Sequence, residues 1–333
     1  MKRLAIPALL ILVAGIHLAS GSSGLLSLTQ VLGELARGPG HEGAANTIVW
    51  DIRLPRLLVA SLSGVSLATV GAAFQALFRN PLADPYVVGV SSGAAVGAAL
   101  AVSLGYGAAL YGLGTVGAGL VTGLASLALV RALAQKRGLV EMGTLLLAGV
   151  TVSALLSALL SLILLLAGQD SGRILAFLLG HTSDANWPRV FALLPFALIG
   201  SFWLARQGKR LNALAMGETT ARRLGVETET LARWLLLVGT AMTAATVGAV
   251  GIIGFVGLVG PHVARRLVGV DWRKSLPTAG GVGALIMVAS DLIGQRLLPA
   301  LTGTAGMEVN VGIVAALLGA PSLLILLKIE RVQ

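Results

Sequence analysis

Residues 53–100 read RLPRLLVASLSGVSLATVGAAFQALFRNPLADPYVVGVSSGAAVGAAL, and this part of the sequence indicates the fold class. It is apolar over more than twenty residues, stops at Pro81 and Pro85, and then becomes apolar again. A hydrocarbon core about 30 Å thick needs about 20 apolar residues for each helical crossing, and proline ends a helix. The pattern therefore predicts two membrane-spanning helices joined by a turn.

The rest of the chain repeats this pattern. Apolar residues make up 56% of the 333 residues, charged residues make up 11%, and the mean hydropathy is +0.90. Soluble domains carry about 25% charged residues. No long polar insert interrupts the apolar runs, so we predict a single all-α, polytopic membrane domain over residues 1–333. About ten runs are long enough to span: Leu4–Ala19, Leu54–Phe78, Val87–Leu104, Leu113–Leu133, Thr144–Ala167, Val190–Ala205, Leu231–Val250, Ile252–Val268, Ala279–Leu298 and Val309–Leu327.

The distribution of positive charge predicts which way the helices face, because Lys and Arg near helix ends stay in the cytoplasm. With the amino terminus inside, the cytoplasmic ends hold most of the 24 Lys and Arg residues, including Arg137 and Arg331. This bias predicts that both termini are cytoplasmic, and it accounts for the net charge of +10 without a nucleic-acid partner. The basic residues left on the outer side are Arg37, Arg53, Arg56, Arg173, Arg189 and Arg296.

The first apolar run has a second interpretation. MKRLAIPALLILVAGIHLASG at residues 1–21 combines a basic start, an apolar centre and a small-residue end, which is the pattern of a secretory signal. Cleavage after this run would leave nine spans and place the new amino terminus outside.

The source of energy for transport is the next question. We place Glu141, Asp291 and Glu308 at helix ends, whereas ion-coupled transporters usually keep an ionisable side chain at mid-depth. The phosphate-binding pattern GxxxxGK followed by Ser or Thr is also absent, since QGKRL at residues 207–211 does not match it. We therefore predict that a partner hydrolyses ATP and that this chain is not an enzyme. A secondary transporter or a channel is the alternative of another class.

The turn FRNPLADPYVVG lies between the second and third predicted spans. Pro81 and Pro85 forbid helix continuation, and Asn80 and Asp84 are suited to capping the turn or the next helix. We predict a turn at the cytoplasmic face, which either serves the structure alone or also contacts a cytoplasmic partner.

Residues 206–230 form a long polar segment that we place in the cytoplasm. Its apolar positions, which include Leu211, Leu214 and Leu224, lie on either side of Gly217 at helical spacing. The spacing predicts two short amphipathic helices with a glycine between them. Their apolar faces need a cover, which lipid headgroups or a docked protein can provide.

GFVGLVGPHVARRLVG at Gly254–Gly269 is a glycine-rich helix that leaves the membrane after two arginines. It contains the lone His262, which we interpret as a packed, hydrogen-bonded side chain rather than a metal or proton site. The chain has no cysteine, which excludes disulfides and thiolate metal sites, and we expect no metal site.

Together these stretches resemble the FecCD family, the membrane permeases of ATP-driven importers for iron chelates, haem and cobalamin. The resemblance covers nearly the whole chain. It rests on RLPR at Arg53–Arg56, QALFRNPLADP at Gln75–Pro85, GVSSGA at Gly89–Ala94, LNALAMGETTARRLGV at Leu211–Val226, GFVGLVGPHVARRLVG at Gly254–Gly269 and VGIVAALLGAPSLLILL at Val311–Leu327.

The resemblance implies a homodimer of ten-helix subunits in the cytoplasmic (inner) membrane of a bacterium or archaeon, with the substrate path along the dimer interface. Two cytoplasmic ATP-binding subunits would use ATP and Mg, and this chain would bind no cofactor. The segment 206–230 would dock into these subunits. The residues that would carry this docking are Gly217, Glu218, Ala221, Arg222, Leu224 and Gly225.

The resemblance also gives the outer arginines a role. Arg53 and Arg56 would pair with carboxylates on an extracytoplasmic substrate-binding protein, and such pairing sets register and association rate. Anchoring of the helix at the headgroups is the alternative. Arg296 would join them, although it lies one position further from Asp291 than is usual in the family.

The cargo implied by the resemblance is a ferric siderophore or another iron chelate, with haem and cobalamin as alternatives. The sequence departs from the family pattern after the fifth span, where it reads FLLGHTSDANW, and at the start of the last span, where Asn310 replaces a common proline. The candidate path residues are therefore Phe177, Gly180, His181 and Asn310.

Overall fold

The computed structural model describes residues 2–21, 24–86, 88–107, 111–136, 139–303 and 306–330. The bundle is helical apart from two small hairpins. Its first helices are α1 (Lys2–Ala19), α2 (Leu28–Arg37), α3 (Ala44–Thr47), α4 (Leu54–Phe78), α5 (Val90–Ser103), α6 (Leu113–Ala134), α7 (Met142–Leu166) and α8 (Ser171–Leu178). The later helices are α9 (Trp187–Pro195), α10 (Ser201–Arg206), α11 (Gly208–Ala215), α12 (Glu218–Arg223), α13 (Thr228–Val250), α14 (Val256–Val268), α15 (Trp272–Thr302) and α16 (Val311–Glu330).

Short connecting elements complete the fold. π-helical stretches at Ile48–Arg53 and Phe196–Gly200 join α3 to α4 and α9 to α10, and a 3₁₀ turn at Gly168–Asp170 precedes α8. The hairpins pair two-residue antiparallel strands, β1 (Ser20–Gly21) with β2 (Gly24–Leu25) and β3 (Gln135–Lys136) with β4 (Leu139–Val140). Arg137, Arg331 and Val87, which the sequence placed at predicted helix ends and loops, lie outside the described residues.

Six helical stretches among the described residues are long and apolar enough to cross a membrane, so the chain is a multi-pass membrane protein. They are Ala44–Phe78, Leu113–Ala134, Met142–Leu166, Trp187–Arg206, Thr228–Val250 and Trp272–Thr302. Three shorter apolar helices, Ala5–Ala19, Val90–Ser103 and Val311–Ile325, coincide with further predicted spans.

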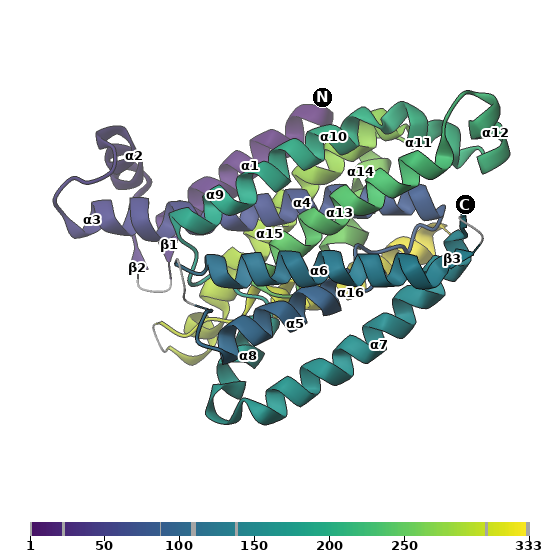
Figure 1. Cartoon of the computed structure of the whole chain (residues 1–333). Coiled ribbons are helices and arrows are strands. Elements are labelled where there is room, and N and C mark those ends of the chain that lie inside the picture. Colours follow the sequence, from purple (N-terminus) through teal and green to yellow (C-terminus); the bar gives the residue numbers. More distant parts are fainter. Residues whose placement is uncertain are drawn as a thin grey trace.

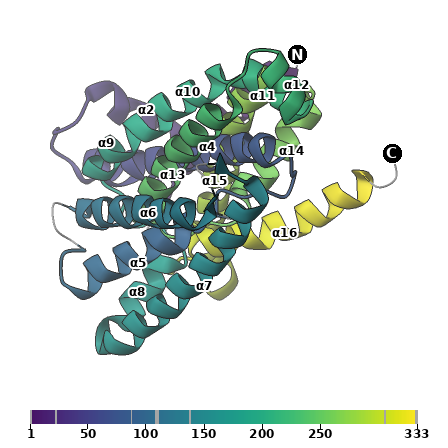
Figure 2. The same ribbon diagram turned by 45° about the vertical axis from the view of Figure 1, so that its right-hand side comes forward.

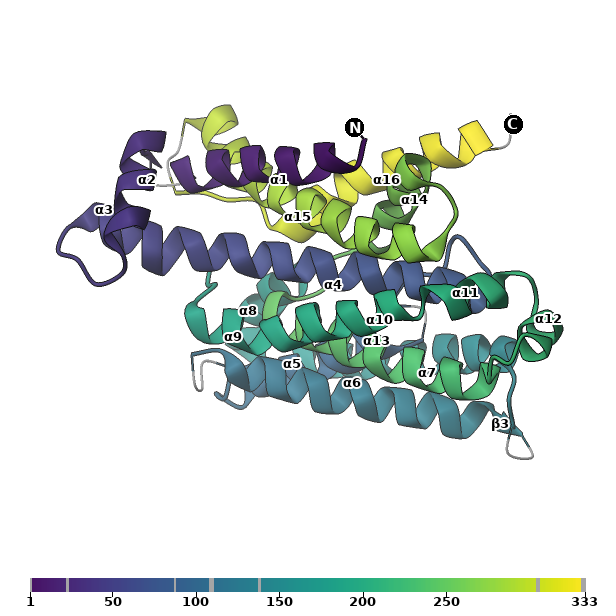
Figure 3. The ribbon, with the colours of Figure 1, turned by 90° about the horizontal axis from the view of Figure 1, so that it is seen from above.

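The helix α4 forms the centre of the bundle. Figure 3 shows it between one group of helices that includes α1, α14 and α15 and another that includes α10, α13 and α6. Glycines allow this close packing: a Cβ on Gly64 would overlap the carbonyl of Gly283 in α15, and one on Gly71 would overlap Gly257 in α14. Small residues at such contacts are the usual means of helix association in lipid.

The helices α7 and α16 lie at the edge of the bundle. Figure 1 shows α7 set apart below α5 and α6, and Figure 2 shows α16 extending away from the other helices. Large apolar side chains such as Leu155 and Leu165 on α7 and Leu317 and Leu324 on α16 are exposed.

Residues 251–255 are not helical, although the sequence predicts a span from Ile252 onward. The chain leaves α13 at Gly251 with φ 78°, and α14 begins only after Phe255, which has φ 68°. Hydrogen bonds replace the missing helical ones: the Tyr86 hydroxyl donates to Ile253 O over 2.7 Å and accepts from Ile253 N over 3.0 Å. Buried irregular backbone persists in a membrane protein only with such partners.

Candidate functional site

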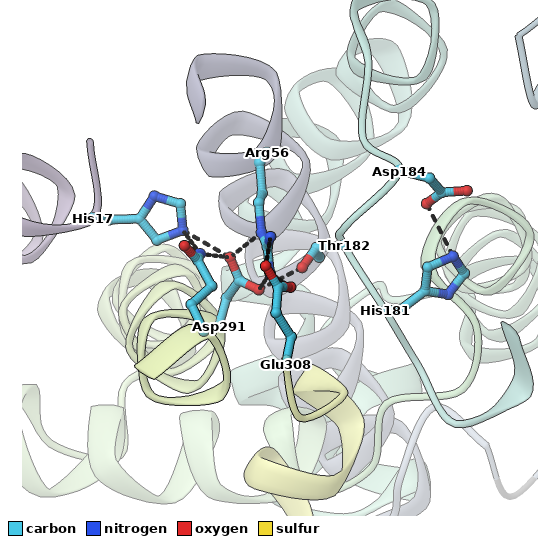
Figure 4. A network of polar contacts seen from close by, with 8 residues as sticks. His17, Arg56, His181, Thr182, Asp184, Asp291 and Glu308 are labelled. Atoms are coloured by element: carbon cyan, nitrogen blue, oxygen red, sulfur yellow. Dashed lines mark hydrogen bonds and ion pairs between the residues drawn. The ribbon is translucent and has the colours of Figure 1, made fainter. Parts of the chain in front are cut away.

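Arg56 on α4 lies in a network of buried ion pairs in the bundle interior. Its guanidinium donates from Nε and Nη2 to the two carboxylate oxygens of Asp291 on α15, over 2.9 and 2.8 Å. It also donates from Nη1 and Nη2 to Glu308, which precedes α16, over 3.1 and 2.8 Å. Figure 4 shows Arg56 held between the two carboxylates. We call Arg56, Asp291 and Glu308 the arginine clamp.

Further side chains complete the shell around Asp291. His17 Nε2 of α1 lies 2.7 Å from Asp291 Oδ2, and Gln295 Nε2 donates to the same oxygen over 2.9 Å. Thr182, in the loop after α8, donates to Asp291 Oδ1. Charges buried in this way are stable only when paired and hydrogen-bonded, so the network ties α1, α4, α15 and the loops before α9 and α16 together.

The position of Asp291 corrects the sequence analysis, which placed it at a helix end. Asp291 is fully buried well inside α15, and the helix continues to Thr302. At 1.5 Å per residue, Asp291 lies about 28 Å along α15 from Trp272, and Arg56 about 33 Å along α4 from Phe78. The clamp therefore lies about one membrane thickness from the end of the bundle that carries α11 and α12.

The arginines predicted to dock a binding protein differ in their surroundings. Arg53 is buried, and its guanidinium donates to Leu18 O over 2.7 Å and to Gly24 O over 3.0 Å. Arg56 is buried within the clamp, and Arg296 is half-buried. Neither Arg53 nor Arg56 is thus the exposed surface cation that the sequence analysis assumed, and their docking role stays a prediction.

A cavity of about 310 Å³ lies beside the clamp. Its lining brings Arg56 and Glu308 together with two of the predicted path residues, His181 and Asn310. Phe177 packs edge-on against His181 with 5.5 Å between ring centroids, and Gly180, with φ 75°, turns the chain between them. The predicted path residues therefore converge at one place, although the structure assigns them no ligand.

Asp184 fixes the orientation of His181 in this loop. His181 Nε2 lies 2.9 Å from Asp184 Oδ1, and Arg189 donates to the same carboxylate. Burial opposes ionisation of Asp184, but His181 and Arg189 outweigh it and hold the pKa of Asp184 below its usual range.

The segment 206–230 folds as the sequence predicts, into two short helices, α11 and α12, separated by Gly217 with φ 107°. Glu218 and Arg222 form an ion pair over 2.7 Å on α12. Ala221 is fully buried against the bundle, whereas the Leu224 side chain after α12 is 59% exposed, and Gly225 adopts φ 80°. The segment is thus fastened to the bundle and presents a mixed polar and apolar face outward.

Asn212 connects this segment to the start of α15. Asn212 Nδ2 on α11 donates to Asp271 Oδ1 over 2.8 Å, and Asn212 Oδ1 accepts from Trp272 N over 3.0 Å. Hydrogen bonds from Arg273 and Asn212 hold the pKa of Asp271 below its usual range. Since Asp271 is the N-cap of α15, α11 holds the first residues of the helix that carries Asp291.

The predicted turn begins at the surface and then enters the bundle. Asn80 and Pro81 are exposed, and Asn80 Oδ1 accepts from Leu82 N over 2.9 Å. Pro85 is buried beside α14, and Asp84 Oδ1 accepts from Tyr86 N over 3.0 Å. Burial raises the pKa of Asp84 to about 6. The second half of the turn therefore supports the non-helical segment at Ile253 rather than lying at the surface.

His262 packs inside α14, as the sequence analysis expects. The residue is buried, and its Nδ1 lies 2.9 Å from Leu258 O.

Comparison with known proteins agrees with this architecture. The model of the FecCD transport family matches residues 9–328, so the chain belongs to that family. It is 39% identical to the cobalamin import system permease protein BtuC of Halobacterium salinarum, over 88% of this chain and 77% of the relative. It is 33% identical to the iron-uptake system permease protein FeuC of Bacillus subtilis, over 96% and 95% of the two chains. A solved structure described as a metal-chelate type ABC transporter in an inward-facing conformation superposes with a TM-score of 0.84 at 30% identity, covering 98% of both chains.

Sequence reasoning missed the arginine clamp and its partner His17. Arg56 and Asp291 lie 235 residues apart, and His17 and Asp291 lie 274 apart, so no local pattern joins them. The available signals were single polar residues in apolar runs, His17 in AGIHLAS and Asp291 in VASDLIG. Such residues almost always face the interior of a membrane bundle and pair with one another.

Proposed function

We propose that this chain is the membrane permease subunit of an ATP-driven importer and that it works as a homodimer of ten-helix subunits with both termini in the cytoplasm. Membership of the FecCD family supports the importer class. The observation that supports the mechanism is that the solvent-exposed segment α11–α12 is bound to the first residues of α15 through Asn212 and Asp271.

In this mechanism, two cytoplasmic ATP-binding subunits dock on α11 and α12 and use ATP and Mg, while this chain binds no cofactor and catalyses no reaction. Closure of these subunits moves α11, and the bonds between Asn212 and the start of α15 carry that movement into the helix. Because α15 also carries Asp291, movement at the cytoplasmic end reaches the arginine clamp at the other end. The helices then shift between two packings, and this shift changes the side of the membrane to which the path is open.

The proposed cargo is a ferric siderophore or another iron chelate, delivered by an extracytoplasmic binding protein. The relative named for iron uptake supports this choice, and the relative named for cobalamin import keeps cobalamin as the second candidate. Haem is the third, from the family resemblance alone. The path lies along the dimer interface. The exposed apolar faces of α7 and α16 are surfaces that a second copy of the chain can cover.

The docking proposal is tested by assembly with the ATP-binding subunit. Leu224→Glu places a charge on the exposed apolar side chain that follows α12, and we expect it to prevent co-purification of that subunit. The control is Leu28→Glu on α2, a leucine that is exposed to a similar extent at the other end of the bundle. Equal co-purification of both variants with the ATP-binding subunit would refute docking on this segment.

A further inference from the structure

The two carboxylates of the arginine clamp are not equivalent. Asp291 is almost completely buried, with a side-chain exposure of 2%, and it is bonded to His17, Thr182 and Gln295 as well as to Arg56. Glu308 is 19% exposed, and within the described residues its side chain is bonded to Arg56 alone. Asp291 is therefore a fixed partner of Arg56, whereas Glu308 can leave with the loss of one ion pair.

Glu308 also lies where an incoming ligand reaches Arg56. The cavity of about 310 Å³ is lined by Arg56, Glu308 and the loop around Thr182, at the end of the bundle opposite α11 and α12. A guanidinium binds a carboxylate with two parallel hydrogen bonds, and Glu308 forms this arrangement now. A carboxylate that entered the cavity would find this face of Arg56 already occupied.

We propose that Glu308 is an internal stand-in for an acidic side chain of the extracytoplasmic binding protein, and that docking exchanges one carboxylate on Arg56 for the other. This inference rests on the proposed function, which supplies the binding protein as the partner. Asp291 stays paired with Arg56 throughout, and the incoming carboxylate replaces the second ion pair that Glu308 gives up, so the exchange costs little.

The exchange gives docking a structural consequence. Glu308 belongs to the segment that leads into α16, and that segment is held nearby by Val309 N donating to Gly294 O and by Gly312 N donating to Gly180 O. Release of Glu308 removes its tie to α4, while these backbone bonds, the bond from Asn310 Nδ2 to Ala176 O and the buried side chains of Val311 and Val314 stay in place. Docking of the binding protein and loosening of the outer end of α16 are then coupled, and each favours the other.

The test measures the affinity of the binding protein for the permease in nanodiscs that contain the assembled importer. Glu308→Gln keeps the size of the side chain but removes the competing charge, so we expect the binding protein to bind more tightly, by about 10-fold. Glu308→Asp keeps the charge on a shorter side chain and should give a smaller increase. Arg56→Gln should abolish the gain when combined with Glu308→Gln. Asp170→Asn is the charge-matched control, because Asp170 is an exposed carboxylate on the same side that pairs with Arg173.

The possible results distinguish failure of the carboxylate exchange from failure of the proposed importer function. Tighter binding for Glu308→Gln but not for Asp170→Asn supports the exchange. Unchanged or weaker binding for Glu308→Gln and Glu308→Asp, in proteins that melt near the wild-type temperature, overturns it while the importer function stands. If the wild-type complex binds no binding protein, the proposed function fails first and the exchange falls with it.

Discussion

Asn212 on α11 is bonded to Asp271 and to the next residue at the start of α15, with one bond from each polar atom of its amide. Nδ2 donates to the Asp271 carboxylate, while Oδ1 accepts from the backbone of Trp272. This contact links the surface helix α11 to the start of α15, the helix whose Asp291 binds Arg56. It therefore connects the proposed ATPase-docking segment to a helix that reaches the opposite side of the bundle.

Removal of this link should separate ATP hydrolysis from transport. Asn212→Ala loses both hydrogen bonds but leaves the exposed face of α11 and α12 unchanged. We expect the assembled complex to hydrolyse ATP at a near-normal rate while uptake falls several-fold, which is measured as the ratio of cargo moved to ATP consumed. Lys274→Ala, an exposed position in the first turn of α15, is the control. An unchanged ratio for Asn212→Ala would show that the link transmits no movement.

Loss of the fixed clamp carboxylate should destabilise the protein strongly. Asp291→Asn removes the most buried ionic partner of Arg56 and leaves only Glu308, and loss of a buried ion pair costs up to about 3 to 5 kcal/mol. We expect a large fall in the unfolding temperature in detergent. Asp170→Asn, at an exposed pair, should change the free energy of unfolding by less than about 1 kcal/mol. Similar melting of the two variants would mean that the buried network contributes little.

The hydroxyl of Tyr86 should contribute more to the stability of the fold than its ring does. Tyr86→Phe leaves both backbone groups of Ile253 without a partner, and a buried unpaired group costs about 1 to 3 kcal/mol. The unfolding temperature of this variant should fall, and backbone hydrogen exchange at residues 251–255 should rise. Tyr106→Phe is the matched control, because Tyr106 is 65% exposed. Unchanged exchange at Ile253 would contradict the assigned support.

The side chain of Asp84 should make the stability of the protein depend on pH. Burial raises its pKa in the folded protein to about 6, above the value of about 3.9 in an unfolded chain. The folded state therefore binds the proton more tightly, so this contribution is fully present below pH 4 and is lost as the pH rises through about 6. Asp184 and Asp271 have lowered pKa values, so their contributions are lost only as the pH falls below about 4.

We expect the unfolding temperature of the wild-type protein to fall between pH 4 and pH 6.5, and Asp84→Asn to flatten this part of the profile. Asp184→Asn should leave the slope in that range as it is. A slope that survives Asp84→Asn would assign the dependence to another group.

Sequence patterns predicted the elements that local chemistry determines. The hydrophobic runs located the long spans, Gly217 divided the segment 206–230, and the prolines ended α4 before the turn. The arginine clamp could not be predicted, because its members meet only after α1, α4 and α15 have packed. The non-helical residues 251–255 were missed for the same reason: GIIGF is an apolar run like its neighbours, and bonds to Tyr86 and Leu178 stabilise its irregular backbone.

The sequence analysis also did not predict that Arg53 and Arg56 are buried. Arg53 and Arg56 precede and open an apolar helix, a position at which long basic side chains usually reach toward the headgroups. Here the carbonyls of Leu18 and Gly24 and the carboxylates of the clamp lie within reach inside the bundle. Partners from distant parts of the chain therefore decided the direction of both side chains.

ATP-driven import is tested by uptake into vesicles that contain this chain, its ATP-binding subunit and its binding protein. Ferric siderophore, haem and cobalamin are compared with ATP, with a non-hydrolysable ATP analogue, and with an imposed ion gradient alone. We expect uptake of one cargo, with an iron chelate as the first choice, only when ATP is hydrolysed. Equal uptake without ATP, driven by the gradient and surviving removal of the ATP-binding subunit, would contradict it and identify an ion-coupled transporter.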